Sequence, residues 1–183
     1  CFSGDHVRGF THVGSHPVLS PTHEITPEDI RLVTRNARTV TLPPDSYVAH
    51  IVPQLFCLDG KTQVTNPVGM LAHRLELTTL IVHANQHRVG TAVHLLKNLQ
   101  LNVQRLVFKG IASARMVVSR EQEELGALVI DMGAGTTDYA LMSRGQVRYA
   151  AAIGVGGDHV TNDLACGLKT TFDEAEKLKL DYG

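Results

Sequence analysis

The feature that most constrains this chain is a turn rich in glycine and threonine between two short apolar runs. The first run covers residues 127–130 and the second ends at Met142, and both have the length and composition of β-strands. Between them the sequence is DMGAGTTD, from Asp131 to Asp138. The pattern predicts a β-hairpin closed by a tight turn.

Such a turn has the chemistry of an anion-binding site. Gly133 and Gly135 lie one residue apart, allowing positive φ angles and a close approach of the backbone to a ligand. Successive N–H groups in the turn form a concave nest for an anion, and Thr136 and Thr137 add hydroxyl donors. Asp131 lies at the mouth of the first strand. Because a carboxylate beside a phosphate is repulsive without a cation between them, Mg²⁺ is implied.

The alternative is an ordinary hairpin whose glycines serve only the turn, since glycine is common in turns of every kind. The flanking Asp131, Thr136, Thr137 and Asp138 favour the anion site over this alternative. The chain contains no G-x-x-x-x-G-K-[ST] loop, so a Walker-type phosphate site is excluded.

Composition describes a globular protein and excludes some classes of function. The chain is 43% hydrophobic and 19% charged, with a net charge of −1, so we expect no nucleic acid as the main partner. The three cysteines form no C-x-x-C pair, which fits a reducing cytoplasm better than a disulfide framework. No apolar run approaches the ~18 residues that span a bilayer, and the N-terminus has no signal-peptide pattern. Because Cys1 stands in place of an initiator Met and Gly183 follows a helical pattern directly, we expect an excised fragment of a longer protein.

The first part of the chain has a strand, helix, strand, strand pattern. Residues 1–10 and 14–20 predict two short strands. A helix follows with Thr26 as its N-cap and Pro27 at its first position, and it ends before the proline pair at 43–44. Its apolar stripe recurs at three- and four-residue spacing, and the residues are Ile30, Val33, Ala37 and Val40.

Two further strands complete this part. Residues 46–58 predict a strand that lies at an edge or contains a bulge, because Pro53 falls inside it. A turn-rich loop over residues 60–69 separates it from a strand over residues 70–83. We expect a small α+β unit.

The remaining predicted helices and strands precede and follow the glycine-rich turn in the sequence. Residues 91–99 and 111–118 predict helices on either side of a strand over residues 103–108, and residues 146–153 predict another strand. A Gly-Gly pair at 156–157 then opens a helix and would place bare N–H groups towards an anion. The alternative there is a plain strand-to-helix turn.

A last helix opens near Thr170. Glu176 and Lys179 lie three residues apart on it and share a face. Such a pair is usually a solvated ion pair.

The string DMGAGTTD resembles the second phosphate loop of the superfamily that includes actin, sugar kinases and heat-shock chaperone ATPases. The strings IDMGAGTTDYALM, IGVGGDHVTNDLACGL and AEKLKLDYG resemble, in order and spacing, the FtsA family of actin-like bacterial cell-division proteins. Upstream, ITPEDI, PPDSYVAHIVPQLFCLDG and NPVGMLAHRLEL are similar to the same family. The resemblance covers nearly the whole chain.

The resemblance implies an α/β fold with incomplete actin-like, ribonuclease H-like lobes. Residues 1–13 and 90–125 would be parts of the first lobe. Residues 14–89 would be an inserted α+β interaction subdomain of the SHS2 type. Residues 126–183 would be the first half of the second lobe, with the phosphate loop.

The resemblance also implies a nucleotide site without a catalytic residue. Asp131 would hold Mg²⁺ through water, while the loop would cradle the β- and γ-phosphates of ATP. Ala134 stands where the family more often has glycine, which is tolerable if its φ is negative. The residues implied for the nucleotide are Gly133, Gly135, Thr136 and Thr137 for the phosphates, Gly156, Gly157 and Thr161 for the phosphate and ribose side, and Glu176 and Lys179 for the adenosine.

The function implied is that of an ATP-binding protein that polymerises and links the FtsZ ring to the cytoplasmic membrane at the division site. FtsZ, other divisome proteins and further copies would be its partners, and a C-terminal helix outside this chain would reach the membrane. The full-length protein would be at most a weak ATPase. With half of the site in this chain, we expect ATP to bind weakly or not at all.

Two other assignments remain open. One is an ATPase of the same superfamily from pilus assembly or cell shape, similar to PilM or MreB. Absence of the inserted strand–helix–strand–strand unit would favour it. The other is a superfamily sugar kinase, which would need a catalytic aspartate near a sugar pocket, and no motif here clearly provides one.

Overall fold

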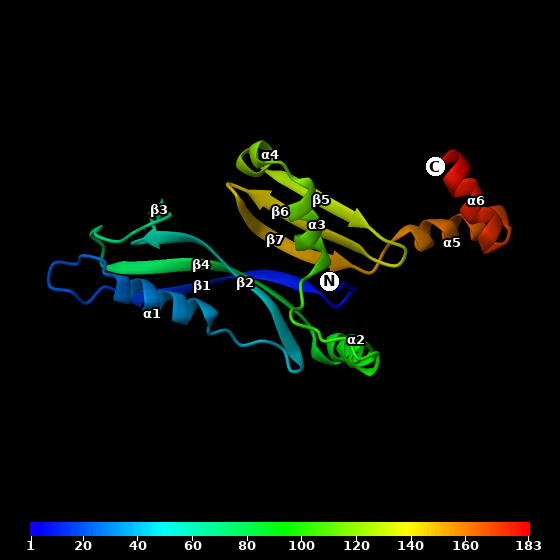
Figure 1. Ribbon diagram of the computed structural model, residues 1–183. Coiled ribbons are helices and arrows are strands. Elements are labelled where there is room, and N and C mark those ends of the chain that lie inside the picture. Colours follow the sequence, from blue (N-terminus) through cyan, green and yellow to red (C-terminus); the bar gives the residue numbers. More distant parts are fainter.

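The computed structural model describes residues 1–183 as two antiparallel sheets with six helices around them (Figure 1). The first sheet has the strand order β1-β4-β2-β3 and the second β5-β6-β7. The first sheet contains β1 (Arg8–Pro17), β2 (Ser46–Leu58), β3 (Thr62–Val64) and β4 (Arg74–Asn85). The second contains β5 (Ala127–Met132), β6 (Thr137–Ser143) and β7 (Gln146–Ile153).

Helix α1 (Pro27–Arg38) lies on the first sheet and begins as predicted, but it ends at Arg38, so Val40 of the predicted stripe lies beyond it. Thr26 is the N-cap, and it forms a capping box with Asp29, which satisfies amides at the open end of the helix. Val33 and Ala37 are fully buried. They belong to a core with strand and loop residues, namely Val18, Ile25, Leu58, Ala72, Leu75 and Leu77.

The strands of the first sheet partly correct the prediction. The two strands expected over residues 1–10 and 14–20 are one strand, because β1 pairs with β4 without a break from Arg8 to Pro17. The register of β2 shifts on either side of Pro53, which confirms the expected irregularity. β3 falls in the loop expected over residues 60–69. It pairs only with Phe56–Leu58, so no strand pairs with the outer side of the rest of β2.

Helices α2 (Gln86–Asn98), α3 (Lys109–Val117) and α4 (Arg120–Leu125) follow. α2 starts earlier than predicted because the Asn85 side chain accepts hydrogen bonds from the amides of His87 and Arg88. The prediction of a strand over residues 103–108 is wrong. A strand needs a neighbouring strand, and the only backbone pairing of this segment is an isolated parallel bridge between Phe108 and Phe2.

One core joins the two sheets. It contains Leu80 and Val82 from β4, Ala114 from α3, and Met142 and Ala150 from β6 and β7. α3 covers one face of the second sheet (Figure 1). The opposite face leaves alternate side chains of β5 open, and Leu128, Ile130 and Met132 are 59–64% exposed.

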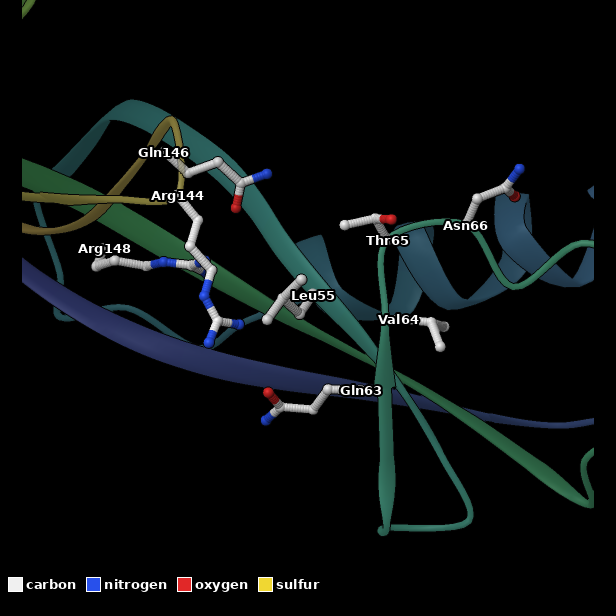
Figure 2. A pocket seen from close by; sticks show the side chains of 8 residues that line it. All are labelled: Leu55, Gln63, Val64, Thr65, Asn66, Arg144, Gln146 and Arg148. Carbon is white, nitrogen blue, oxygen red and sulfur yellow. The ribbon is translucent and has the colours of Figure 1, made fainter. Parts of the chain in front are cut away.

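A pocket of about 430 Å³ lies between β3 and the turn from β6 to β7 (Figure 2). Arg144 and Arg148 come from the turn side, and Gln63 and Asn66 face them from the first sheet. None of the residues predicted for the nucleotide lines this pocket.

Helices α5 (Gly157–Leu168) and α6 (Phe172–Tyr182) pack on each other and project away from the sheets (Figure 1). Both were predicted, and Thr171 caps α6. None of the helices combines the length and apolar character needed to cross a membrane.

Candidate functional site

The predicted hairpin forms, and its turn presents free amides. β5 and β6 pair from Ala127–Met142 to Met132–Thr137. The Gly133 amide donates to the Thr136 carbonyl at 2.8 Å, which closes the turn. The next three amides, of Ala134, Gly135 and Thr136, donate to no protein acceptor. Three consecutive free N–H groups are the arrangement that binds an anion.

The expected positive φ at the two glycines is wrong, because neither Gly133 nor Gly135 has one. The expected close approach of a ligand stays a prediction. A Cβ at Gly133 would lie 3.2 Å from the Thr136 carbonyl oxygen, whereas one at Gly135 would meet nothing within 4 Å. Position 133 therefore favours glycine because a side chain would crowd the Thr136 carbonyl, and not because the backbone is left-handed there. Ala134 also lacks a positive φ, so its methyl group causes no backbone strain.

Helix α5 begins directly beside the turn. The amides of Gly157 and Asp158 donate to the carbonyls of Gly133 and Ala134, each at 2.9 Å. The expectation of bare N–H groups at this helix start is therefore wrong, because the turn itself occupies them. A Cβ at Gly156 would lie 2.4 Å from the carbonyl oxygens of Gly133 and Ala134, so only glycine permits this contact.

Asp131 lies on the α3 side of β5 and makes two polar contacts there. Its Oδ1 is 2.9 Å from Lys109 Nζ, and its Oδ2 accepts a hydrogen bond from Ser113 Oγ at 2.6 Å. The hydrogen bonds from Ser113 and Lys109 lower the pKa of Asp131, against the effect of burial. The carboxylate is therefore charged and directed at polar groups.

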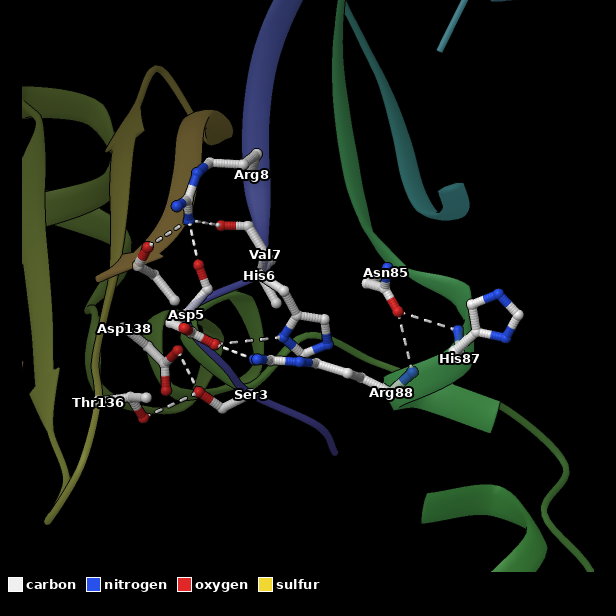
Figure 3. Close-up of polar contacts among 11 residues, drawn as sticks. Ser3, Asp5, His6, Val7, Arg8, Asn85, His87, Arg88, Thr136 and Asp138 are labelled. Atoms are coloured by element: carbon white, nitrogen blue, oxygen red, sulfur yellow. Dashed lines mark hydrogen bonds and ion pairs between the residues drawn. The ribbon is translucent and has the colours of Figure 1, made fainter. Parts of the chain in front are cut away.

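Asp138 is fully buried behind the turn (Figure 3). Its Oδ1 accepts a hydrogen bond from Ser3 Oγ at 2.5 Å, and the same hydroxyl is 3.3 Å from Thr136 Oγ1. Its Oδ2 has no hydrogen-bond partner, and Lys109 Nζ lies 3.6 Å from it. Lys109 thus faces two carboxylates.

The threonines of the turn differ in what they offer. Thr137 is buried, and its hydroxyl donates to the Val155 carbonyl at 2.7 Å, so it holds the segment before α5 in place. The Thr136 hydroxyl contacts only Ser3.

Thr161, Glu176 and Lys179 come together between α5 and α6. Lys179 Nζ is 2.6 Å from Glu176 Oε2 and donates to Thr161 Oγ1 at 2.8 Å. The same ammonium lies 3.3 Å from the Gly157 carbonyl oxygen. Hydrogen bonds from Lys179 and Thr161 lower the pKa of Glu176. The residues expected around a nucleotide therefore form two clusters, at the turn and at α5–α6, which meet where Gly157 bonds Gly133.

Sequence reasoning missed Ser3, Lys109 and Ser113. They lie 135, 29 and 18 positions from the aspartates they contact. No spacing or motif marks them, because only the packing of α3 and the N-terminal segment on the second sheet brings them to the turn.

Comparison with known proteins covers most of the chain. The family model described as the SHS2 domain inserted in FTSA matches residues 4–83. The model described as cell division protein FtsA matches residues 128–183.

Three curated relatives are each named cell division protein FtsA. The protein of Pseudomonas aeruginosa is 34% identical over 98% of this chain, which spans 43% of that protein. The Borreliella burgdorferi protein is 34% identical over 99% of the chain and 44% of its own length. That of Escherichia coli is 30% identical over 99% and 43%. The chain thus spans less than half the length of the relatives it matches.

Among solved structures, a chain of a PilM–PilN type IV pilus biogenesis complex superposes with a TM-score of 0.61. It is 17% identical, and the superposition covers 96% of this chain and 48% of that chain. At this identity the match shows the fold alone. Because it includes the strand–helix–strand–strand unit, the expectation that a PilM-like protein lacks this unit is wrong.

The fold therefore does not distinguish an FtsA-like from a PilM-like protein, whereas the two family models do. With its SHS2 unit and its glycine- and threonine-rich hairpin in an incomplete actin-like α/β fold, the chain belongs to the FtsA family of cell-division proteins.

Proposed function

We propose that this chain is part of an ATP-binding, actin-like cell-division protein and contributes about half of its nucleotide site. The observation that carries the proposal is the run of three free amides at residues 134–136, with Asp131 and a cation directly behind it. Amides in this arrangement fit the oxygens of a phosphate chain.

Each residue implied by the resemblance has a place in this proposal. Gly133, Gly135, Thr136 and Thr137 build the turn around the β- and γ-phosphates, the buried Thr137 by holding the segment before α5. Asp131 lies on the side where Mg²⁺ would be held through water. Gly156, Gly157 and Thr161 line the phosphate and ribose side, and Glu176 and Lys179 meet the adenosine.

A bound nucleotide would mainly control assembly and would be hydrolysed slowly. A full-length protein would therefore have at most weak ATPase activity. The proposed partners are FtsZ, other divisome proteins and further copies of the protein. A C-terminal helix beyond this chain would hold the protein at the inner face of the cytoplasmic membrane at the division site.

The proposed division into units follows the resemblance, with one adjustment. Residues 1–13 and 90–125 belong to the first lobe, residues 14–89 to the interaction unit and residues 126–183 to the second lobe. Because β1 is continuous from Arg8 to Pro17, the first boundary is better placed before β1. Within the interaction unit, the side of β2 over residues 46–55 that no strand pairs with is the proposed contact for a partner.

The second candidate is an ATPase of pilus assembly, and the superposition on the PilM–PilN complex is the observation in its favour. Its 17% identity supports the fold only. Relatives at 30–34% identity favour cell division.

The experiment is a calorimetric titration with ATP of a protein of the relatives' full length that contains this chain. Gly156→Ala should weaken binding about tenfold, because its Cβ would clash with the turn and displace it. Gly167→Ala, in open space on α5, should bind like the wild type. Absence of ATP binding, or equal binding by Gly156→Ala, would overturn the proposal. The 183-residue chain alone should bind weakly or not at all, and micromolar affinity would contradict that expectation.

A further inference from the structure

We propose that Lys109 is a built-in cation beside the phosphate-binding turn that neutralises part of the carboxylate charge for which the proposed function invokes Mg²⁺. The inference rests on the proposed function for the identity of the ligand. It rests on geometry for the role of the lysine.

The position of Lys109 is defined by three contacts. It is the first residue of α3, and its Nζ lies 2.9 Å from Asp131 Oδ1 and 3.6 Å from Asp138 Oδ2. A Cβ built on Gly133, the first residue of the turn, would lie 3.8 Å from the same Nζ. The ammonium therefore lies between two carboxylates and next to the turn whose amides are free.

The charges of this cluster require a cation. Asp131 accepts a hydrogen bond from Ser113, and Asp138 accepts one from Ser3, but neither serine carries charge. Lys109 is the only basic side chain within ion-pair distance of either aspartate. Asp138 is fully buried and its Oδ2 has no hydrogen-bond partner, so without Lys109 its charge would be uncompensated.

Lys109 remains charged at neutral pH. An ordinary lysine ammonium has a pKa of about 10.4 and is therefore protonated at neutral pH. The positive charge is therefore present at neutral pH whether or not a metal ion is available in solution.

The consequence concerns how phosphate is tolerated beside Asp131. Mg²⁺ would neutralise the carboxylate and coordinate phosphate oxygens in an octahedron. An ammonium neutralises the carboxylate and donates hydrogen bonds, but it does not impose that geometry. Less of the Asp131 charge is thus left to repel a phosphate that approaches the turn, and Mg²⁺ held through water would have less charge to neutralise.

The test replaces the lysine and asks whether a metal ion takes its place. In the 183-residue chain, Lys109→Met leaves the two carboxylates without the ammonium that lies 2.9 Å from Asp131 and 3.6 Å from Asp138. The variant should bind Mn²⁺ at least about tenfold more tightly than the wild type, because a positive charge within a few ångströms has been removed. Electron paramagnetic resonance of free Mn²⁺ measures this directly. Lys109→Arg keeps the charge and should show no gain.

Two measurements cover the possibility that Lys109→Met folds poorly. The double variant Lys109→Met/Asp138→Asn removes the buried charge, so it should fold and should lose the gain in Mn²⁺ affinity. Circular dichroism with and without Mn²⁺ follows folding. A Lys109→Met chain that is unfolded and regains structure only with Mn²⁺ supports the inference, and one that Mn²⁺ does not restore overturns it.

The outcomes also separate this inference from the proposed function. A folded Lys109→Met chain without a gain in Mn²⁺ affinity overturns the role of Lys109 and leaves the ATP proposal standing. A gain in Mn²⁺ affinity in a protein that never binds ATP supports Lys109 as the built-in cation and overturns the proposed function.

Discussion

Two regions of this molecule each bury an aspartate, and they satisfy it in different ways. At the start of α1, Asp29 is 8% exposed and accepts hydrogen bonds from the Thr26 amide and hydroxyl at 2.9 and 2.6 Å. Behind the hairpin turn, Asp138 is fully buried, and its contacts are Ser3 and Lys109. The first aspartate is held mainly by a residue three positions away, and the second by residues from distant parts of the chain.

The difference distinguishes the Asp29 cluster, which stabilises a helix, from the Asp138 cluster, which belongs to a candidate binding site. Both carboxylate oxygens of Asp29 have partners, because Oδ2 accepts the two Thr26 bonds and Oδ1 lies 3.2 Å from His16 Nε2. The group therefore stabilises a helix and leaves nothing available for a ligand. The cluster around Asp138 leaves one carboxylate oxygen without a donor and lies beside three free amides. Incomplete satisfaction of buried polar groups is a feature of sites that bind something.

The largest expected effect disrupts packing in the α1 region. A Cβ on Gly14 of β1 would lie 2.2 Å from the Ala37 amide nitrogen and 2.4 Å from its Cα. Because both are backbone atoms of α1, the helix must shift, and Gly14→Val should lower the free energy of unfolding by about 3 kcal/mol. Urea denaturation measures this. Gly90→Ala, on α2 in open space, is the control and should not destabilise the chain. A loss below about 1 kcal/mol for Gly14→Val would show that α1 adapts.

The next effect tests the hairpin region. Lys109→Met should lower the free energy of unfolding by about 2 kcal/mol, because it leaves Asp138 charged and unpaired. The value is below that for a fully buried pair because the Lys109 side chain is 36% exposed. Asp138→Asn should suppress most of the loss, which a double-mutant cycle measures. Additive effects of the two substitutions would contradict the pairing.

A smaller effect is expected for the capping box at the start of α1. Thr26→Ala removes the N-cap of α1 and should cost about 1 kcal/mol in the free energy of unfolding. Arg35→Ala, on the exposed side of the same helix, is the matched control. If the two variants proved equally stable, the capping box would have no energetic role.

The smallest effect is a dependence on pH that both regions share. Burial alone would raise the pKa of Asp29, but hydrogen bonds from Thr26 lower it overall, and hydrogen bonds from Ser113 and Lys109 lower that of Asp131. A pKa that is lowered in the folded state stabilises the fold above the unfolded value of about 3.9. This stabilisation is lost as the pH falls through the folded values. Unfolding midpoints should therefore decrease below about pH 4, and less steeply for Asp29→Asn/Asp131→Asn than for the wild type. Equal slopes would show that neither pKa is lowered.

Much of the architecture follows from local signals. The start of α1, the hairpin from β5 to β6, strand β7 and the last two helices were all predicted from caps, turns and periodicity. These signals act within a few residues, where the physical cause and its effect lie close together along the chain. The predicted roles of Gly133, Gly135 and the other nucleotide residues remain predictions, although the structure brings these residues into two adjoining clusters.

The predictions that were wrong concerned segments whose structure depends on residues far away in the sequence. The segment 103–108 is not a strand because its backbone pairs only with Phe2, in an isolated bridge. β1 is one strand because β4 pairs with all of it. The α5 amides are occupied because the turn lies against them.

By itself, the sequence determined a hairpin whose turn is predicted to bind an anion, a capped helix on a small sheet and the resemblance that identified the family. Only the tertiary structure decided which amides of the turn stay free and that Lys109 lies between Asp131 and Asp138. The physical reason is range. Dihedral preferences and helix caps act between near neighbours, whereas charge compensation in a buried cluster depends on whichever residues the packing of α3 on the second sheet brings within a few ångströms.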